Sequence, residues 1–249
     1  MMIFEPGKEQ YDFEEGQILL IDKPLKWTSF DVVNKVRYLL KNQFGLKKIK
    51  VGHAGTLDPL ATGLLIICTG KFTKQIESLQ ACSKEYVATF MLGATTPSFD
   101  RETEIDRTFS TDGITREQVE AVLQTFEGEQ EQVPPVFSAK QIDGQRAYVA
   151  ARKGKTVELK PAHINIEQIN LEECELPKVT VKIRCSKGTY IRALARDFGE
   201  RLGSGAYLHD LRRTASGDFS VDKAIGIEEF EKIIRNLQPL SKNNVNNLS

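Results

Sequence analysis

The sequence predicts an α+β fold with a mixed, mainly antiparallel sheet and flanking helices. Strand-like and helix-like segments follow one another without a regular strand–helix–strand period, a pattern typical of α+β proteins. Of the 249 residues, 40% are hydrophobic and 27% are charged, which is the balance of a globular chain and not of a disordered one. A chain of this length corresponds to one domain or two small ones.

Four segments predict strands. Gln17–Ile21 is a short apolar run that favours a buried strand, Leu64–Thr69 is a second apolar run, and Tyr86–Leu92 alternates in part. Val179–Cys185 alternates cleanly between apolar and polar residues, as a strand with one buried face does. Between the first two strands, the region 47–63 is rich in glycine and is expected to be irregular.

Three helices are predicted from capping residues and apolar periodicity. The first begins after an N-cap at Ser29 and continues to about residue 40. The second opens with the capping-box pair Thr115 and Gln118. The third is the amphipathic segment Tyr190–Leu202, which a following glycine can end.

The predicted organisation is a polar extension over residues 1–14, one main domain over 15–240 and a polar tail over 241–249. Residues 132–155, with two prolines and mixed charge, form an excursion from the main domain. The longest hydrophobic runs are five residues long, whereas a membrane helix needs about 20. The first ten residues lack the basic and apolar segments of a signal peptide.

The cysteines and histidines indicate a cytoplasmic protein without a metal site. None of the four cysteines forms a C-x-x-C pair, and no two of the three histidines have the spacing of a helical metal clip. We therefore expect reduced cysteines that pack in the interior, and no disulfide framework or zinc centre.

The net charge of zero conceals a strong segregation of charge along the chain. Residues 32–75 contain eight Lys or Arg and a single acidic residue, and residues 181–213 contain eight basic residues against three acidic ones. Residues 97–134 reverse the balance, with ten Asp or Glu and three Arg. Two basic segments predict a face that binds a polyanion. The alternative is that each is an ordinary solvated surface.

The glycine-rich segment 52–70 surrounds one carboxylate, Asp58, which Pro59 biases toward extended geometry. A lone Asp in such a loop usually forms a side-chain turn. Its cationic surroundings would also keep the carboxylate ionised, as a nucleophile or base requires. A nucleotide phosphate loop is excluded, because six residues separate Gly63 from Gly70 and Phe72 follows the lysine.

A second candidate site lies in CSKGTYIR, residues 185–192, where a strand ends, the chain turns and a helix begins. Tyr190 and Arg192 fall at the helix start, which attracts anions, and an arginine pairs well with a carboxylate. The alternative places Tyr190 in the core and Arg192 on the surface, and the local sequence does not decide between the two.

The chain resembles the bacterial tRNA pseudouridine synthase B family from about residue 16 to residue 213. The resemblance is carried by six ordered motifs: GQILLIDKPLKWTSFDVVNKVR, GHAGTLDPLATGLL, KEYVATFMLGATT, VPPVFSAKQIDGQRAY, CSKGTYIRALARDFGERLG and LRRTASG. It implies the pseudouridine synthase fold, with a mobile thumb-like insertion at 132–155. It also implies isomerisation of uridine 55 in the tRNA T loop to pseudouridine, with the target base flipped out of its stack.

The family's functional residues can be carried over position by position. The nucleophilic aspartate corresponds to Asp58, the tyrosine stacked on the flipped base to Tyr86, and the basic partner of the aspartate to Arg192. Further positions line the uridine pocket, contact the RNA or lie near the active site: His53, Tyr190, Leu211 and Lys23. The resemblance implies no metal and no cofactor. It leaves three chemical routes open, namely addition at the base, attack at the anomeric carbon and elimination through a glycal.

The implied partner is the T arm of tRNA, bound by a monomer that needs no membrane and no protein partner. The chain departs from the family at Lys26, where a glycine is usual, and in the acidic segment GATTPSFDRE. We expect no C-terminal RNA-binding domain of the PUA type after about residue 240, although many relatives carry one. A non-catalytic tRNA-folding chaperone on the same scaffold is the alternative function. A small-molecule hydrolase would leave the two basic segments unexplained.

Overall fold

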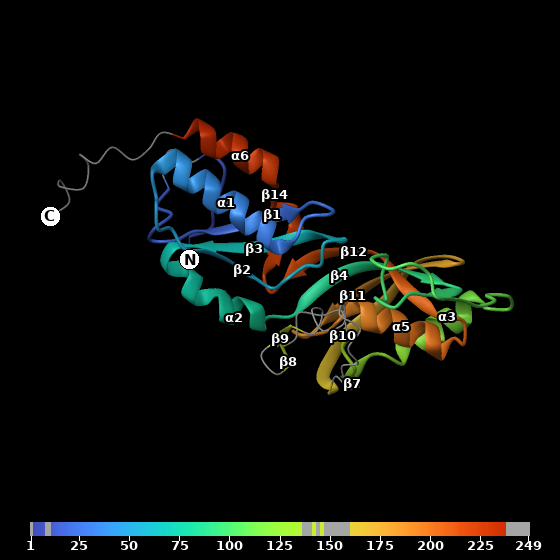
Figure 1. Cartoon of the computed structure of the whole chain (residues 1–249). Helices are drawn as coiled ribbons and strands as arrows, with labels where there is room; N and C mark the ends of the chain where they lie inside the picture. The colour runs from blue at the N-terminus through green and yellow to red at the C-terminus, as the bar shows by residue number, and fades with distance from the viewer. Residues whose placement is uncertain (1, 8–10, 136–140, 143–144, 147–159, 238–249) are drawn as a thin grey trace. The chain divides into compact units, whose positions relative to one another are not determined.

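The computed structural model describes residues 2–7, 11–135, 141–142, 145–146 and 160–237. Most of the predicted thumb-like insertion and the whole of the polar tail lie outside the described residues. The chain divides into two compact units (Figure 1). The first unit is formed by Met1–Cys82 with Arg213–Ser249, and the second by Ser83–Arg212.

The first unit contains five complete strands, three α-helices and two 3-10 helices among the described residues. In chain order these are β1 (Ile18–Lys23), α1 (Ser29–Phe44), β2 (Val51–Ala54), β3 (Ala61–Thr69), η1 (Gly70–Gln75), α2 (Ile76–Ala81), β13 (Phe219–Ser220), η2 (Val221–Lys223), β14 (Ile225–Gly226) and α6 (Ile227–Asn236). The division between the units falls inside one further strand, β12 (Ala206–Ser216).

The second unit contains the start of β12, the remaining strands and two helices among the described residues. They are β4 (Lys84–Leu92), β5 (Ala94–Thr95), β6 (Arg107–Thr108), α3 (Arg116–Gln124), β7 (Gly128–Gln132), β8 (Gln141–Ile142), β9 (Gln145–Arg146), β10 (Ala162–Glu175), β11 (Lys178–Cys185) and α5 (Ile191–Arg201).

The sheet is mixed, as predicted. In the first unit the strand order is β14-β1-β3-β12, with β2 paired to β3 and β13 to β12. The β1–β14 pair is parallel, whereas β1 pairs with β3 in antiparallel register. In the second unit the order is β12-β4-β11-β10-β7, and the last three pairings are antiparallel. The predicted α+β class is therefore confirmed.

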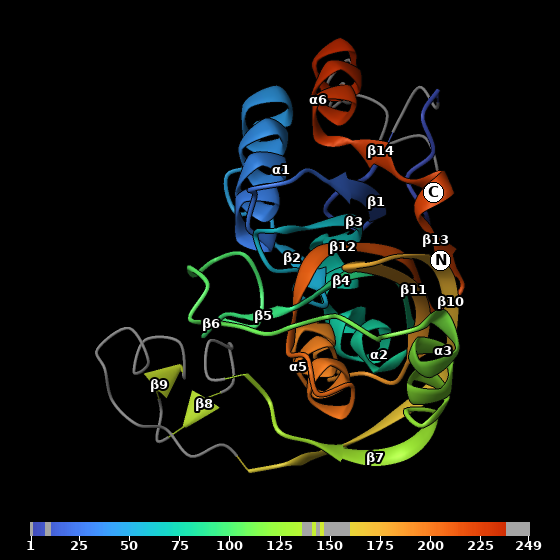
Figure 2. The same cartoon turned by 90° about the vertical axis from the view of Figure 1, so that its right-hand side faces the viewer.

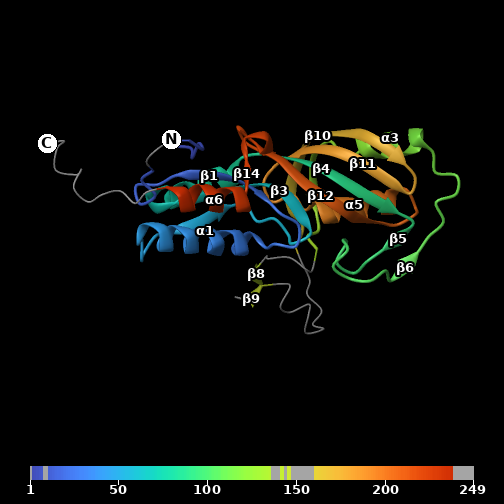
Figure 3. The ribbon, with the colours of Figure 1, turned by 90° about the horizontal axis from the view of Figure 1, so that it is seen from above.

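Strand β1 begins with the apolar run Ile18–Ile21, and both faces of that run are buried. Leu19 and Ile21 point into a core formed with α1 and α6. Ile18 and Leu20 point into a second core that includes Leu79 of α2. The two helices α1 and α6 run side by side over the first face (Figure 3). A strand buried on both faces gives an unbroken hydrophobic run instead of an alternating one, which is why the short apolar segment predicted it.

The N-terminal residues differ from the polar extension that was expected. Phe4, Tyr11 and Phe13 are 6%, 8% and 2% exposed and belong to the core beneath α1 and α6. The Phe4 ring lies 4.5 Å from Tyr11 and 5.5 Å from Phe230 of α6, measured between centroids. Burial of three aromatic rings anchors a segment in which five of the first fourteen residues are charged.

The second unit packs its two helices against one another and against the strands (Figure 2). Every second residue of β4 is buried, so the strand has one core face and one half-exposed face. Phe90 of β4 meets Phe198 of α5 at 5.4 Å between ring centroids. The alternation predicted for β4 and β11 is thus confirmed.

The N-cap of helix α1 lies one residue before the predicted cap, Ser29, which is instead the first residue of the helix. Thr28 is the N-cap, and its hydroxyl accepts a hydrogen bond from the backbone N–H of Asp31 at 3.0 Å. The Asp31 carboxylate accepts in return from the Thr28 backbone at 2.8 Å, which completes a capping box. Strand β2 also forms within the region 47–63 that was expected to be irregular. The predicted capping box of Thr115 and Gln118 is confirmed at α3.

We expect Gly70→Ala to destabilise the protein by about 3 kcal/mol. Gly70 has φ +52°, and an added Cβ would lie 2.0 Å from the backbone oxygen of Glu14, so strain and overpacking combine. Gly45→Ala is the matched control, since its φ of +67° is similar but no atom lies within 4 Å of the added Cβ; it should cost about 1 kcal/mol. Urea denaturation measures both, and equal losses would contradict the steric argument.

Candidate active site

The backbone around Asp58 is anchored on both sides. The Leu57 N–H donates to the hydroxyl of Ser29 at 2.8 Å, and that hydroxyl donates back to the Leu57 carbonyl at 3.1 Å. On the other side, the Lys26 N–H donates to the Pro59 carbonyl at 2.8 Å. The Asp58 side chain is half-buried. These contacts hold the backbone on both sides of Asp58, and the residue itself stays partly accessible.

Lys26 adopts the left-handed backbone region, with φ 68°. The loop that joins β1 to α1 needs this conformation to place the Lys26 N–H against Pro59. A lysine adopts it at a cost that glycine avoids, in keeping with the glycine that the resemblance leads one to expect here. The departure noted in the sequence therefore changes the residue and keeps an αL-compatible turn.

Arg213, in strand β12, holds the backbone of the same region through hydrogen bonds. It is only 1% exposed, and its guanidinium donates from Nε to the Leu64 carbonyl at 2.7 Å and from Nη2 to the Gly55 carbonyl at 3.1 Å. Gly63 must be glycine for this approach, because a Cβ there would lie 2.3 Å from the Arg213 oxygen. Sequence reasoning did not single out Arg213, although it stands in the LRRTASG motif.

Lys23 is fully buried, and its ammonium donates to the carbonyls of Pro24 at 2.9 Å and Trp27 at 2.6 Å. Burial lowers its pKa to about 8 from 10.5, the charge of Asp58 raises it in part, and the Arg213 charge lowers it again. Lys23 is thus a cation in the electrostatic field of Asp58, and it loses its proton more readily than a surface lysine.

We expect the free energy of unfolding to change with pH because Lys23 titrates at different pH values in the folded and the unfolded protein. Because its pKa is lowered in the folded protein, the unfolded chain holds the proton more tightly between about pH 8 and pH 10.5. The contribution of Lys23 to stability therefore rises with pH across this window and is lost as the pH falls through about 8. Urea denaturation of wild type and Lys23→Met from pH 7 to 10 measures the difference, and parallel curves would contradict the assignment.

His53 lies on β2 and is half-buried. Burial lowers the pKa of its imidazole, and the nearby Arg213 charge lowers it further, with a smaller opposing effect from the Gly55 backbone. Its Nδ1 atom is buried and has no hydrogen-bond partner among the described residues. The ring is therefore neutral at pH 7 and presents a flat, weakly polar surface.

In the second unit, Arg192 is buried in the first turn of α5 at 4% exposure, so the alternative of a surface residue is wrong. Its Nε lies 3.6 Å from the carboxylate of Asp100, which is 5% exposed, and its Nη1 donates to the Ser98 carbonyl at 3.3 Å. Sequence reasoning missed Asp100, because it lies in the acidic segment far from Arg192 in the chain.

Tyr190 is the N-cap residue of α5 and is half-buried. The side chain of Gln132 holds its backbone on both sides, accepting from the Tyr190 N–H at 2.8 Å and donating to the Tyr190 carbonyl at 3.1 Å. Gln132 is buried and stands at the end of β7. This amide orients the start of α5, and nothing in the local sequence marks it for that role.

Tyr86 and Leu211 lie on strands of the second unit. Tyr86 is on β4, 9% exposed and opposite Ile183 of β11. Leu211 is half-buried on β12, which neighbours β4 in the sheet. The structure thus places Asp58, His53 and Lys23 in the first unit and Tyr86, Tyr190, Arg192 and Leu211 in the second. The pairing of Asp58 with Arg192 stays a prediction.

Part of the basic charge is neutralised by partners distant in sequence. Four such ion pairs are Lys35–Glu231, Lys71–Glu15, Lys182–Glu85 and Arg184–Glu167. A group of lysines on and after the end of α1 remains exposed and has no ion pair within the described part of the chain: Lys41, Lys47, Lys48 and Lys50. No group of three metal-ligating side chains occurs among the described residues. No helix in the part described is long and apolar enough to cross a membrane.

Comparison with known proteins assigns the class. The model of the TruB family pseudouridylate synthase N-terminal domain matches residues 41–191, and that of the tRNA pseudouridylate synthase B C-terminal domain matches residues 192–242. These matches define an isomerase of the pseudouridylate synthase class. Within that class, the chain belongs to the TruB family.

Similar curated proteins carry the name tRNA pseudouridine synthase B. The protein of Phocaeicola vulgatus is 61% identical over 219 residues, which are 88% of this chain and 93% of that one. The protein of Parabacteroides distasonis is 56% identical over 223 residues, covering 90% of this chain and 95% of that one. The resemblance inferred from the motifs is confirmed.

Solved structures support the same fold. A chain of a Cbf5–Nop10–Gar1 complex is 28% identical, with a TM-score of 0.68 over 88% of this chain. A chain of an H/ACA ribonucleoprotein bound to a substrate RNA containing 2′-deoxyuridine is 26% identical, with a TM-score of 0.65 over 91% of this chain. The chain spans 54% and 60% of the lengths of these two proteins. The predicted pseudouridine synthase fold is confirmed.

Proposed function

We propose that the protein converts uridine 55 in the T loop of tRNA to pseudouridine, with Asp58 as the reacting carboxylate. Membership of the TruB family supports the reaction class. The anchored loop is the observation that carries the role of Asp58. Hydrogen bonds to Leu57 and Pro59 hold the backbone on both sides of Asp58, which supports a preorganised reacting residue.

The proposed reaction rearranges one nucleoside. The bond from N1 of the base to C1′ of the ribose breaks, the base turns, and a new bond joins C5 to C1′. A proton leaves C5 and a proton is taken up at N1, so no other reactant is consumed. Asp58 acts at the sugar or at the base, by addition, by attack at C1′ or by elimination to a glycal. The buried ammonium of Lys23 favours the ionised form of this carboxylate.

Base flipping is part of the proposal, because the glycosidic bond is inaccessible in a stacked base. Tyr86 would stack on the extruded uracil and return about 1–3 kcal/mol of the unstacking energy. The neutral ring of His53 would occupy the space that the base leaves. The exposed lysines after α1 would contact phosphates, which position the RNA without reading its sequence.

A non-catalytic tRNA chaperone remains the second candidate, since opening the tRNA to reach the base could also help it fold. An activity assay separates the two functions. We also propose that the protein acts in the cytoplasm, which is consistent with four cysteines that form no disulfide. That it works as a monomer without a protein partner stays a prediction, which light scattering of the pure protein with and without tRNA can test.

Incubation with an unmodified T stem-loop tests the function directly. Site-specific mapping should find pseudouridine at position 55 alone, and a stem-loop carrying cytidine at that position should give none. Affinity for the RNA should fall as salt rises, because phosphate contacts release counterions. Pseudouridine at a different position would overturn the assigned site, and no product in any tRNA would leave the chaperone as the better explanation.

A further inference from the structure

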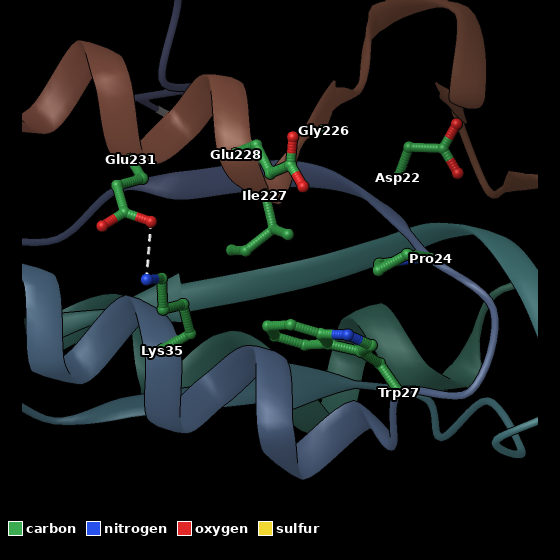
Figure 4. Close-up of a pocket in the computed structure, with 8 residues that line it drawn as sticks. All are labelled: Asp22, Pro24, Trp27, Lys35, Gly226, Ile227, Glu228 and Glu231. Carbon is green, nitrogen blue, oxygen red and sulfur yellow. Dashed lines mark ion pairs between the residues drawn. The ribbon is translucent and has the colours of Figure 1, made fainter.

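A pocket in the first unit lies outside the proposed reaction (Figure 4). It has a volume of about 400 Å³ and lies between the loop after β1, helix α1 and the start of α6. Lys35 of its lining pairs with Glu231 at 2.6 Å, and Glu231 also accepts a hydrogen bond from Arg235. Asp22 has an interaction within the chain as well. Most of the charge on this lining is therefore balanced by the protein itself, and the lining selects no class of ligand.

The segment between β5 and β6, in the second unit, contains a strained backbone position. Phe99 has φ 60°, and within the described part of the chain it is one of two non-glycine residues with positive φ, the other being Lys26. The left-handed region is costly for a residue with a bulky side chain. Such strain persists only where the surrounding structure holds it, and strained residues cluster at functional sites.

The two neighbours of Phe99 in the chain both contact Arg192. Before it, the Ser98 carbonyl accepts from Nη1 of Arg192 at 3.3 Å, and after it, the Asp100 carboxylate lies 3.6 Å from Nε. The hydroxyls of Thr96 and Ser98 both donate to the Asp100 carbonyl, at 2.7 and 3.2 Å, so the turn closes across Phe99. The left-handed conformation folds the chain back here, which lets a carbonyl before Phe99 and a side chain after it meet one guanidinium.

Contacts of the backbone and of the side chain hold Phe99 in this conformation. Its carbonyl accepts from the Leu208 N–H of β12 at 2.9 Å. The guanidinium carbon of Arg196 lies 4.9 Å from the centroid of the Phe99 ring, within the range of a cation–π interaction. Arg196 follows Arg192 by four residues in α5, so the two arginines project from the same face of the helix. The turn and the ring of Phe99 thus contact neighbouring positions of α5.

We propose that Phe99 is a positioning residue for Arg192. Its left-handed backbone presents the Ser98 carbonyl and the Asp100 carboxylate to the guanidinium, and its ring, held by Arg196, keeps the turn in place. This role rests on the proposed function, in which Arg192 is the basic partner of the reacting carboxylate. Because the guanidinium has two fixed acceptors, its direction is set before RNA binds, as preorganised electrostatic catalysis requires.

A double-mutant cycle tests the coupling of Phe99 to Arg192 without any catalytic readout. Urea denaturation is measured for wild type, Phe99→Val, Arg192→Met and the double variant, since a β-branched residue disfavours the left-handed region strongly. Arg192→Met should change the unfolding equilibrium constant about tenfold less in the Phe99→Val protein, where its contacts are already weakened. Phe99→Ala, with a smaller penalty, replaces Phe99→Val if that variant does not fold. Additive effects would overturn the proposal.

Turnover on a T stem-loop gives the second readout. Phe99→Val should lower kcat about 10²-fold and leave KM within about threefold of wild type, because a misplaced guanidinium impairs the reaction and not the capture of RNA. Phe99→Gly adopts the left-handed region without strain and should lose less, and Phe99→Tyr, which keeps the ring, should stay within about threefold of wild type. Phe109→Val is the matched control: Phe109 is an aromatic residue of the same unit that is 39% exposed and has no positive φ, so kcat should change less than about twofold.

The opposite results can be told apart. An unchanged kcat in Phe99→Val would overturn the positioning role, and a raised KM with unchanged kcat would overturn it in favour of a direct contact with RNA. Equal losses in Phe99→Gly and Phe99→Val would overturn the argument from the backbone. A wild-type protein that forms no pseudouridine would reject the proposed function, whereas the urea cycle would still decide whether Phe99 holds Arg192.

Discussion

Asp58→Asn should abolish pseudouridine formation on a T stem-loop while leaving RNA affinity within about threefold of wild type. Asparagine has nearly the shape of aspartate, so the hydrogen bonds that anchor Leu57 and Pro59 remain, but the amide can neither attack nor accept a proton. Loss of a nucleophile or base that is essential to the reaction lowers the turnover rate by at least about 10⁴-fold. Pseudouridine mapping measures turnover, and filter binding measures affinity.

Asp31→Asn is the control for this experiment. Asp31 also acts electrostatically on Lys23, but it caps α1 and takes no part in the proposed reaction. Its replacement should cost about 1 kcal/mol of stability and leave turnover close to wild type at 25 °C. Unchanged turnover in Asp58→Asn would reject the proposed role of the carboxylate. If Asp31→Asn lost activity as completely, the loss would reflect folding and not chemistry.

The correctly predicted elements are those whose burial can be inferred from the order of apolar and polar residues within the segment itself. The apolar runs Ile18–Ile21 of β1 and Leu64–Cys68 of β3 are buried on both faces, whereas β4 and β11 alternate because only one face of each is buried. The N-cap of α1 was predicted one residue too late, at Ser29, although the local sequence identifies it. A capping box needs an acidic or amide residue three positions after the cap, and only Thr28, with Asp31, meets that rule.

Two elements were missed although their residues carry a local signal. Strand β10 alternates at Ile164 and Ile166 and again at Ile169 and Leu171, but an irregularity in its pairing to β11 shifts the phase between the two pairs. Helix α6 has its buried residues Ile227, Phe230 and Ile234 at helical spacing, in a short segment that is otherwise largely charged. The first residues looked polar because their charged side chains outnumber Phe4 and Phe13. The core that buries these two rings also includes residues of α6, which lies near the other end of the sequence.

The residues of the candidate site likewise fall into two groups, those that could be recognised from the sequence and those that could not. Asp58 and Arg192 stand in motifs that can be recognised, whereas the residues that hold the site in shape act over long sequence separations. Gln132 reaches Tyr190 across 58 residues, and Arg213 reaches Leu64 across 149. Contacts of this length depend on the sheet order, which no local pattern specifies.

Arg192→Met should destabilise the protein by about 3–5 kcal/mol, more than any other substitution considered above. Arg192 and Asp100 are both nearly inaccessible to water, so removal of the guanidinium leaves a buried carboxylate without this cation. Arg184→Met is the control: Arg184 pairs with Glu167 at a shorter distance, 2.9 Å, but both side chains are exposed to solvent. Its loss should cost less than about 1 kcal/mol.

The double variant Arg192→Met with Asp100→Asn decides whether the pair itself is responsible. If the cost of Arg192→Met comes from stranding the Asp100 charge, neutralising Asp100 as well should recover part of it, and the two losses should not add. Urea denaturation of wild type, the two single variants and the double variant gives the four free energies of unfolding that this double-mutant cycle needs. Strict additivity would show that Arg192 stabilises the fold through its other contacts, such as the Ser98 carbonyl, and that burial of the ion pair contributes little. A coupling of about 1–3 kcal/mol would instead mean that Asp100 fixes the guanidinium at the start of α5, where the proposed reaction needs it.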